Sequence, residues 1–572
     1  MGALDWTLFA GYLAVIVSIG AWNARRAETT RGFFVADRSI PWWAVGLSVM
    51  ATQASAITFI GTTGKGYADG LRFVQFYLGL PIAMVILAFT LVPLYHRSGV
   101  LTAYELLGRR FDTKTRVLAA LVFLIQRCLS LGIVIYAPSI VLSMLLGWEL
   151  ATTILGMTIL AIGYTALGGI RAVIWTDVVQ MLLIFAGLGV VAFAILGRLP
   201  AGSSFSDALE LAQITGRSRV LDFSFDPTNR YTVWSGVLGG TFLFLSYFGC
   251  DQSQVQRFLS GRSLRDNRLA LAFNALFKLP VQLAVLLIGV LMFSAFHFDQ
   301  PPLLFDANAL AELEAEPQGA ALEELERGYT VALDERRQAA IALWDTLPAN
   351  REQAAERYRA AAASVETLRS TAVALAREVV PGYDDTNSVF PYFVLRYLPA
   401  GLAGLLLAAI FAAAMSSIDS ELNALSATSV VDIYRPFVNR SAPDGHYVAA
   451  SRVFTLVWGA LAASFALYAG RLGSVIEAVN MLGSYFYGSL LGVFALFATR
   501  VANGHGAFTG VLSGVAAVAL ADARFDVAWL WLNPIGCATT FVVGILVSSL
   551  SGSSDDGSVA RKEAAIELRE QP

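Results

Sequence analysis

Residues 408–429 read AAIFAAAMSSIDSELNALSATS. With the apolar residues before it, this stretch has the length and character of a helix that crosses a bilayer. Its middle nevertheless holds the acid Asp419 among three serines, Ser416, Ser417 and Ser420. A carboxylate inside a bilayer is costly unless it has a partner or a cavity, and such residues commonly mark ion or solute pathways. The stretch therefore predicts a membrane helix with a function.

The rest of the chain has the composition of an integral membrane protein. Hydrophobic residues make up 56% of its 572 residues, charged residues only 15%, and the mean hydropathy is +0.61. A soluble domain carries about 25% charged residues. Repeated apolar runs of roughly 20 residues predict an all-α membrane protein of about thirteen transmembrane helices. The predicted spans are 3–22, 42–62, 72–95, 117–145, 149–168, 173–196, 232–250, 269–296, 400–430, 447–470, 474–499, 506–522 and 529–550.

Basic residues favour one orientation of these spans. Alternate loops carry clusters of Lys and Arg within 25–38, 97–116, 257–268 and 435–452, whereas the other short loops carry fewer. Positive residues accumulate in cytoplasmic loops. We therefore expect a multi-pass protein of the plasma (inner) membrane, surrounded by the lipid bilayer, with its N-terminus outside and its C-terminus in the cytoplasm.

One internal segment is too polar for a bilayer. Residues 297–388 are rich in Ala, Glu and Arg and have apolar positions every three or four residues, which is typical of surface helices. They predict an extracellular helical hairpin that either binds a partner or is an insertion tolerated by a surface loop. The expected organisation is a leading helix and inner loop (1–41), a first part of the membrane core (42–296), the insertion (297–388), the rest of the core (389–500), trailing helices (501–550) and a cytoplasmic tail (551–572).

Several function classes lack support in the sequence. A net charge of −3 gives no indication of nucleic-acid binding. The three cysteines form no CxxC pair, and the four histidines are scattered, so no catalytic metal centre is expected. The spans show no nucleophile–base pair, and the chain has no Walker GxxxxGK[ST] sequence. We therefore expect neither an enzyme nor an ATP-driven pump.

Ionisable residues inside the spans are the main functional candidates. Each needs a partner, a cavity or a role, and structural ion pairs between helices are the alternative for all of them. They are Arg127, Asp177, Lys278, Asp419, Glu421 and Glu477.

Hydroxyl-rich patches accompany these charges. The second span contains SVMATQASAITFIGTTGKG (48–66), and the ninth contains the serines described above. Hydroxyl, carboxylate and carbonyl oxygens suit Na⁺, and unwound helix segments supply such carbonyls in transporters. We expect helix breaks in the polar run of the second span and at the Gly239–Gly240 pair of the seventh.

Four stretches together resemble one family. They are ATQASAITFIG (51–61), GGIRAVIWTDVVQ (168–180), YFGCDQSQVQRFLSGRS (247–263) and AAAMSSIDSELNALSATSVVDIYRP (412–436). In this order and spacing they resemble the solute:sodium symporter family, which includes bacterial sodium/sugar and sodium/sialic acid symporters. The resemblance covers residues 3 to about 550. It implies a LeuT-type fold, in which five helices repeat in inverted topology, with the second to eleventh spans as the core and the second and seventh as broken helices.

The resemblance also implies sodium ligands. A first site would use the side chains of Ser416 and Ser417 with the carbonyls of Ala51, Ala54 and Ala413. A second site, found in some members, would pair an acid of the TDxxQ sequence with residues of the ninth span, so that one or two Na⁺ ions bind. Its residues would be Asp177, Ser416, Asp419 and Ser420, and the carboxylate of Asp419 departs from the hydroxyl that some members carry.

The solute site is implied by the same comparison. Sugar-transporting members place a tyrosine before the (D/N)Q pair of the seventh span and a lysine in the next helix, which match Tyr247 and Lys278. Gln53, Ser55 and Thr58 would line the broken second helix. Weaker candidates for the same cavity are Gln75, Arg127 and Asn480.

The predicted function is sodium-coupled import of a small polar organic solute, sugar or sialic-acid-like, by alternating access. Arg127 suits a carboxylate bidentately, so a monocarboxylate or amino acid is the alternative solute. Proton coupling through Asp177 and Asp419 is a second alternative. A solute sensor is disfavoured, because the tail after the last span is too short for a signalling domain.

Overall fold

The computed structural model describes residues 2–24, 29–200, 202–316, 319–380, 383–399 and 401–551. Among them, ten helical runs are long and apolar enough to cross a membrane, and two further apolar helices are shorter. The prediction of an all-α membrane protein is confirmed, whereas the count of thirteen helices stays a prediction. The basic positions Arg25 and Arg26 and the predicted tail from residue 552 onward lie outside the described residues.

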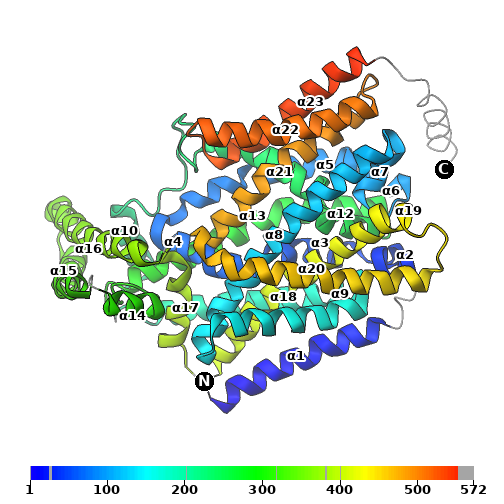
Figure 1. The fold of residues 1–572 in the computed structure, drawn as a ribbon. Helices are drawn as coiled ribbons and strands as arrows, with labels where there is room; N and C mark the ends of the chain where they lie inside the picture. Colours follow the sequence, from blue (N-terminus) through cyan, green and yellow to red (C-terminus); the bar gives the residue numbers. More distant parts are fainter. Residues whose placement is uncertain are drawn as a thin grey trace.

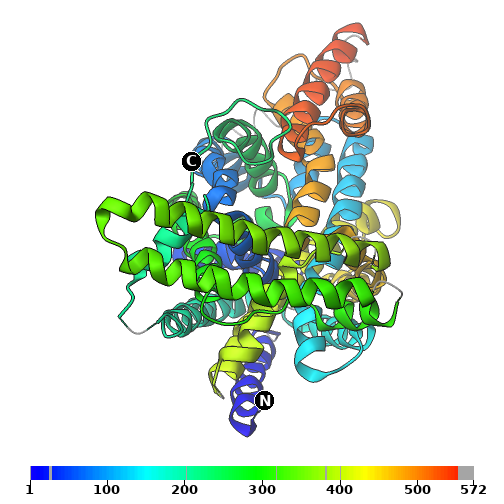
Figure 2. The same ribbon diagram turned by 90° about the vertical axis from the view of Figure 1, so that its left-hand side faces the viewer.

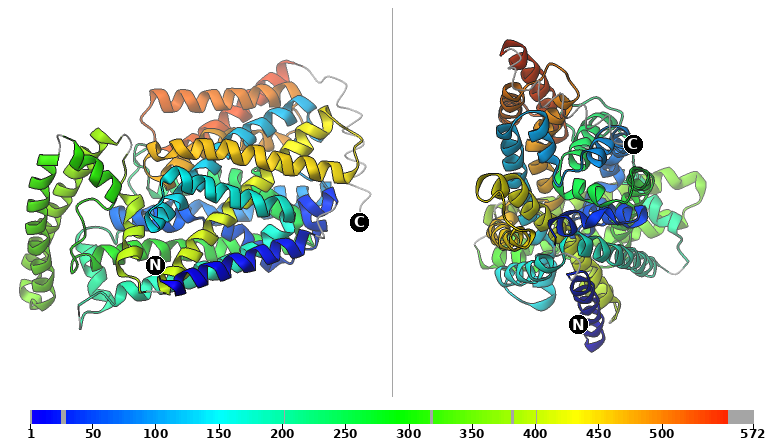
Figure 3. Two further views of the ribbon diagram at one scale, coloured as in Figure 1. Left: turned by 60° about the horizontal axis from the view of Figure 1, so that its bottom comes forward. Right: turned by 90° about the vertical axis from the view of Figure 1, so that its right-hand side faces the viewer.

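The bundle is built from long helices that run from end to end (Figures 1 and 3). They are α1 (Ala3–Ala24), α8 (Thr113–Leu146), α9 (Leu150–Leu196), α13 (Leu264–Ala295), α18 (Leu402–Thr428), α20 (Asp444–Ala469), α21 (Val475–Phe497), α22 (Gly504–Arg524) and α23 (Leu532–Leu550). Shorter helices complete it: α2 (Thr30–Val35), α3 (Trp42–Gln53), α4 (Thr63–Asp69), α5 (Gly79–Phe89), α6 (Leu91–Ser98), α7 (Ala103–Arg110), α10 (Phe205–Ile214), α11 (Gly240–Gly249), α12 (Gln252–Ser260), α17 (Thr386–Tyr397) and α19 (Arg435–Phe437).

Helix α9 joins two predicted spans through a kink. Gly169 has φ 58° and ψ −171° inside an otherwise helical run. This left-handed backbone favours glycine, and a Cβ here would press on the carbonyl of Phe33 at 2.7 Å. The boundary predicted between 149–168 and 173–196 therefore corresponds to a glycine kink.

The predicted break in the second span is confirmed. Helix α3 ends at Gln53, Ala54 has φ −88° and ψ 57°, and the chain turns helical again before a π-turn, η2 (Thr58–Thr62). Helix α4 follows directly. The last carbonyls of α3 therefore lack helical partners at this point in the bundle.

The break predicted at Gly239–Gly240 is wrong. A π-turn, η4 (Ser235–Gly239), runs directly into α11, and both glycines have helical dihedral angles. A Cβ at Gly239 would lie 2.7 Å from the carbonyl of Leu530, so this glycine serves close packing of neighbouring backbones. The chain breaks instead at Cys250 and Asp251, between α11 and α12.

Residues 251–268 are also not simply the cytoplasmic loop that their charge predicted. Their first half forms α12, and every residue of this helix is buried. Its glutamines bond to backbone carbonyls, with Gln252 donating to Leu101 at 3.0 Å and Gln256 to Phe34 at 2.7 Å. A polar helix can be buried where most of its polar groups find such partners, and a hydropathy pattern does not reveal those partners.

The leading helix α1 lies along the outside of the bundle against α9 and α18 (Figure 3). Asp5 Oδ1 accepts hydrogen bonds from the backbone N–H groups of Gly401 at 2.6 Å and Gly404 at 2.8 Å. Carboxylates at a helix N-terminus stabilise the unpaired N–H groups there. The first helix of the chain therefore caps α18.

The polar segment forms a separate layer at one end of the bundle. Helices α14 (Ala307–Ala315), α15 (Gly319–Asp345) and α16 (Arg351–Val379) lie there, and α15 and α16 pair as a long hairpin across that end (Figures 1 and 2). The start of α1 lies at the same end, whereas α6, α7 and α19 lie at the opposite one (Figure 1). Which end faces the cell exterior stays a prediction.

A buried histidine predicts pH-dependent docking of this hairpin. His297 is 2% exposed, with Nδ1 2.8 Å from the Phe293 carbonyl and Nε2 2.7 Å from the Tyr358 hydroxyl on α16. Burial and the charges of Arg336 and Arg217 hold the pKa of His297 well below its ordinary value. The unfolded histidine has a pKa of about 6.5, so the neutral form stabilises docking above that pH and the contribution is lost as the pH falls further.

The protection of α16 against hydrogen exchange, relative to the intrinsic exchange rate at each pH, should therefore fall between about pH 6.5 and 5. In His297→Gln, which does not titrate in this range, the loss of protection should be much smaller. An equal loss of protection in both proteins would contradict the assignment to His297.

Candidate functional site

Hydroxyls of α18 face the carbonyls at the end of α3. Ser416 Oγ donates to the Ala51 carbonyl at 3.0 Å, and Ser417 Oγ donates to the Thr52 carbonyl at 2.9 Å. Both hydroxyls also lie near the carbonyl of Ala413, at 3.2 and 3.4 Å. Four of the five predicted first-site residues are thus brought together, and the Thr52 carbonyl joins them.

The helix break explains why a cation suits this place. Ala51 and Thr52 belong to the last turn of α3, and Ala54, the fifth predicted residue, forms the break itself. The carbonyls of a final turn carry the negative end of the helix dipole. Hydroxyl oxygens that turn their protons away would complete a shell of hard oxygen ligands suited to Na⁺.

The predicted second sodium site contains a cation of the protein itself. Arg257 on α12 is fully buried, and its Nη2 lies 3.2 Å from Asp177 Oδ2 and also donates to Ser420 Oγ. Its Nε donates to Ser48 Oγ at 2.8 Å, and Ser48 donates to Asp177 at 2.5 Å. Ser420 also lies 3.3 Å from Asp419 Oδ1. The guanidinium therefore occupies the neighbourhood of Asp177 and Ser420.

Arg127 is paired inside the protein. It contacts Asp251, at the break before α12, and Glu421 at 3.0 Å, and it donates to the Tyr487 hydroxyl at 2.8 Å. Its guanidinium also lies 5.6 Å from the ring centre of Tyr247. The structure thus brings two predicted solute residues together. Two carboxylates already balance Arg127, as the ion-pair alternative expected.

Lys278 has no such balance. It is fully buried on α13, and within the described part of the chain no group accepts a hydrogen bond from its Nζ and no carboxylate lies within 4.0 Å of it. One turn further, neither side-chain amide atom of Gln282 is bonded, and Gln53 Oε1 at the end of α3 is likewise unbonded among these residues. Buried polar atoms without partners are rare and need an explanation.

These unpaired groups lie alongside the break. Before it, Asn274 Nδ2 on α13 donates to the Gly46 carbonyl at 3.0 Å. Beyond it, Gly289 on α13 packs directly on the Thr63 carbonyl. The stretch of α13 between these two anchors contains Lys278 and therefore runs past the interruption at Ala54.

The other predicted solute residues divide into two groups. Ser55 and Thr58 lie at the break, where Thr58 Oγ1 donates to the Gln53 carbonyl at 3.2 Å. Gln75 uses both ends of its amide on the backbone, donating to Tyr231 at 2.9 Å and accepting from Asp222 at 2.7 Å. Asn480 donates to Ile476 within its own helix at 2.6 Å. The contacts of Gln75 and Asn480 are structural and do not join them to the break.

Sequence reasoning missed Arg257, Asp251 and Tyr487. Arg257 had been assigned to a loop by its charge, although it follows an apolar helix by only a few residues. Asp251 directly follows the same apolar run, which is the available signal for a buried acid at a helix end. Tyr487 lies in an apolar helix where nothing in the sequence separates it from a packing residue.

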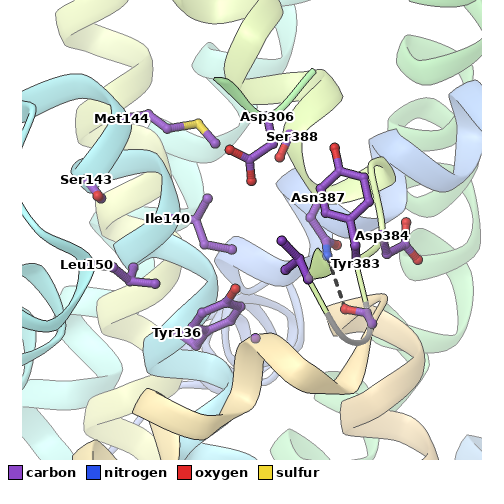
Figure 4. A pocket seen from close by; sticks show the side chains of 13 residues that line it. Tyr136, Ile140, Ser143, Met144, Leu150, Asp306, Tyr383, Asp384, Asn387 and Ser388 are labelled. Atoms are coloured by element: carbon purple, nitrogen blue, oxygen red, sulfur yellow. Dashed lines mark hydrogen bonds between the residues drawn. The ribbon is translucent and has the colours of Figure 1, made fainter. Parts of the chain in front are cut away.

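Two cavities lie at the end of the bundle that carries the hairpin. A cavity of about 120 Å³ between α8 and the N-terminus of α17 is lined by Tyr136, Ile140, Asp306 and Asp384 among others, with Asn387 beside it bonded to the Gly473 carbonyl (Figure 4). A larger one, about 620 Å³, is lined by four basic residues and two acids. The first suits cations or neutral groups, and the second suits anions.

Comparison with known proteins identifies relatives of the whole chain. The model of the sodium:solute symporter family matches residues 33–313 and 365–514. Human sodium-coupled monocarboxylate transporter 2 is 25% identical, covering 96% of this chain and 84% of its own. The human sodium/iodide cotransporter is 29% identical over 90% of this chain and 69% of its own. The putative sodium-dependent multivitamin transporter of Drosophila melanogaster is 28% identical over 90% and 74%.

A solved structure shares the fold. The outward-open, substrate-bound structure of a Na⁺-coupled sialic acid symporter has a TM-score of 0.75 against this chain, at 23% sequence identity, and covers 96% of this chain and 98% of its own. The expected LeuT-type architecture is thereby confirmed.

Proposed function

Because the chain belongs to the sodium:solute symporter family, we propose that it couples Na⁺ entry to the uptake of a small organic anion that carries a carboxylate. Sodium coupling is the defining property of the family. The carboxylate rests on one observation: the fully buried side-chain amine of Lys278, beside the helix break, has no counter-charge among the described residues.

The surroundings of Lys278 have a physical consequence for the solute. An isolated ammonium is strongly unfavourable in a low-dielectric interior, so a buried lysine without a counter-charge favours its neutral form. A ligand that brings a negative charge would stabilise the ammonium and bind to it. The unbonded oxygen of Gln53 and the unbonded amide of Gln282 would bind the remaining polar groups of that solute. A neutral sugar would bring no counter-charge, whereas a monocarboxylate or a sialic acid would.

Sodium and solute would bind cooperatively around one helix break. Na⁺ at Ser416 and Ser417 would bridge α3 and α18. The solute would bind between the same break and α13, and Tyr247 would close over it. Alternating access requires that both together stabilise one state more than each does alone. One Na⁺ that enters with one carboxylate anion moves no net charge, so the Na⁺ concentration gradient supplies the driving force.

The contacts of Arg257 favour one Na⁺ in each cycle. A guanidinium bonded to Asp177 and Ser420 would repel a second cation at that place. The second site therefore stays a prediction that requires Arg257 to move away, and proton coupling through Asp177 meets the same obstacle.

A solute panel tests the proposed function. The purified protein should be stabilised against heat by pyruvate, lactate, nicotinate or N-acetylneuraminate in Na⁺ but not in K⁺, and neutral glucose should have little effect. In Lys278→Gln this stabilisation should fall by at least about tenfold in apparent affinity, the cost of one charge-assisted hydrogen bond. Stabilisation by glucose alone, or equal carboxylate affinity in Lys278→Gln, would refute the carboxylate.

A further inference from the structure

The larger cavity at the hairpin end carries an excess of positive charge. Its volume is about 620 Å³, and its walls come from α4, the 3₁₀ helix that follows it (Gly70–Leu78), the segment after α10, the loop before α11 and the start of α21. Helices α4 and α10 lie next to the hairpin in Figure 1. Four cations line it, against two carboxylates: Lys65, Arg72, Arg217 and Arg230 against Asp69 and Glu477.

Glu477 joins three of these segments. One of its oxygens lies 3.0 Å from Lys65 Nζ on α4 and accepts from the Tyr231 hydroxyl at 2.7 Å. Its other oxygen lies 2.6 Å from Arg230 Nη1, in the loop before α11. Helix α4 is the second half of the broken helix whose first half supplies the predicted sodium carbonyls. A single carboxylate at the start of α21 thus holds this half-helix at the mouth of the bundle.

Two of the cations are less engaged. Among the described residues, Arg72 has no side-chain hydrogen bond and no carboxylate within 4.0 Å. Arg217 stacks on the ring of Phe293 at 3.9 Å and donates to the Tyr67 carbonyl, and its ion pair at 3.2 Å is with Glu366, whose side chain is 63% exposed. The cavity can therefore accept an additional negative group.

We propose that this cavity is a vestibule that captures the carboxylate solute, and that the carboxylate then replaces Glu477 on Lys65 and Arg230 and so releases α4 from α21. Arg72 and Arg217 attract the anionic solute into the cavity. The solute can then replace Glu477 on Lys65 and Arg230, because both the solute and Glu477 bind through a carboxylate. The end with the hairpin is then the outer end, as the loop charges predict. This inference rests on the proposed function, since only an anionic solute would be attracted by the positive charge of the vestibule and compete with Glu477.

The exchange keeps Lys65 and Arg230 paired with a carboxylate, because one carboxylate replaces another. The side chain of Arg230 is 57% exposed, so the solute can reach this pair from water. A cleft lined by charges of one sign also raises the encounter rate of an opposite charge by a factor of about 10 or more, and salt screens the effect.

Arg72→Gln tests the capture step. In proteoliposomes at low ionic strength, the apparent KM for each carboxylate that stabilises the protein in the solute panel should rise about tenfold, since a focusing charge is lost. The maximal rate and the half-saturating Na⁺ concentration should stay unchanged, and the difference should vanish at high ionic strength. Arg219→Gln is the matched control, because Arg219 is exposed in the loop that carries Arg217 but does not line the cavity.

The outcomes separate the two proposals. Carboxylate uptake that needs Lys278 but is indifferent to Arg72→Gln refutes the vestibule alone, as does an equal effect of Arg219→Gln. Glu477→Gln should lower the KM for the carboxylate, because the competing charge is removed; an unchanged or higher KM refutes the exchange. If the wild-type protein transports no carboxylate, the proposed function fails, and the vestibule fails with it.

Discussion

Replacement of Ser417 by alanine is expected to abolish the stimulation of uptake by Na⁺. Ser417 Oγ lies 2.9 Å from the Thr52 carbonyl and is 1% exposed, so no water can take over its place as a ligand without rearrangement. Loss of a supporting group around a bound metal ion typically costs 10–100-fold in affinity, and loss of a direct ligand should cost about 100-fold or more. The measurement is initial uptake against Na⁺ concentration in proteoliposomes.

A serine on the same helix provides the control. Ser426 is also buried, but it bonds to Asn423 and Ser451, away from the break. Ser426→Ala should keep the wild-type Na⁺ response. If Ser417→Ala transports with an unchanged half-saturating Na⁺ concentration, Na⁺ does not bind between α3 and α18 as proposed.

Replacement of Arg257 by methionine should cost the folded protein about 3–5 kcal/mol, because a buried carboxylate, Asp177, would lose its counter-charge. The double variant Asp177→Asn/Arg257→Gln should recover most of this loss, since neither charge remains. Thermal or denaturant unfolding of the purified proteins measures both effects. Arg262→Met, only five positions along the chain at an exposed site, should change stability by less than about 1 kcal/mol.

The same residue decides the stoichiometry. With the guanidinium in place, paired tracer fluxes of Na⁺ and solute should give one Na⁺ per carboxylate, and uptake should depend on Na⁺ without cooperativity. A ratio of two would show that Arg257 leaves Asp177 during the cycle and that a second Na⁺ replaces it. Wild-type stability in Arg257→Met would contradict the stabilising ion pair between Arg257 and Asp177.

The general architecture was predictable because it depends on patterns that a sequence contains directly. The length of the apolar runs predicted the helices. The polar run after Met50 correctly indicated the broken second span. Hydroxyls and an amide within an apolar helix indicate a place where backbone groups need hydrogen-bond partners from outside the helix. The glycine pair of the seventh span gave a wrong prediction, because glycine can serve close packing of helices as well as a helix break. The Leu530 carbonyl, which lies against Gly239, shows that this glycine serves close packing.

The chemistry of the site was less predictable because it depends on pairs that are distant in sequence. Arg257 and Asp177 are 80 residues apart, and Arg127 and Glu421 are 294 apart. From one sequence, an arginine in an exposed loop cannot be distinguished from an arginine that pairs with a buried acid. The fold distinguishes them, because it brings the acid close. Lys278 was recognised as a candidate from its position inside a span and from the family resemblance, but the absence of a counter-charge among the described residues required the coordinates.

The cap that Asp5 places on α18 has a consequence for motion. The helix that carries Ser416 and Ser417 is fastened at its start to the first helix of the chain, through Gly401 and Gly404. Tilting of α18 would carry α1 along, so we expect the two helices to move together even though α1 precedes the predicted transporter core. A spin-label pair on these helices should keep its distance throughout the transport cycle, whereas a pair on α1 and α4 should not.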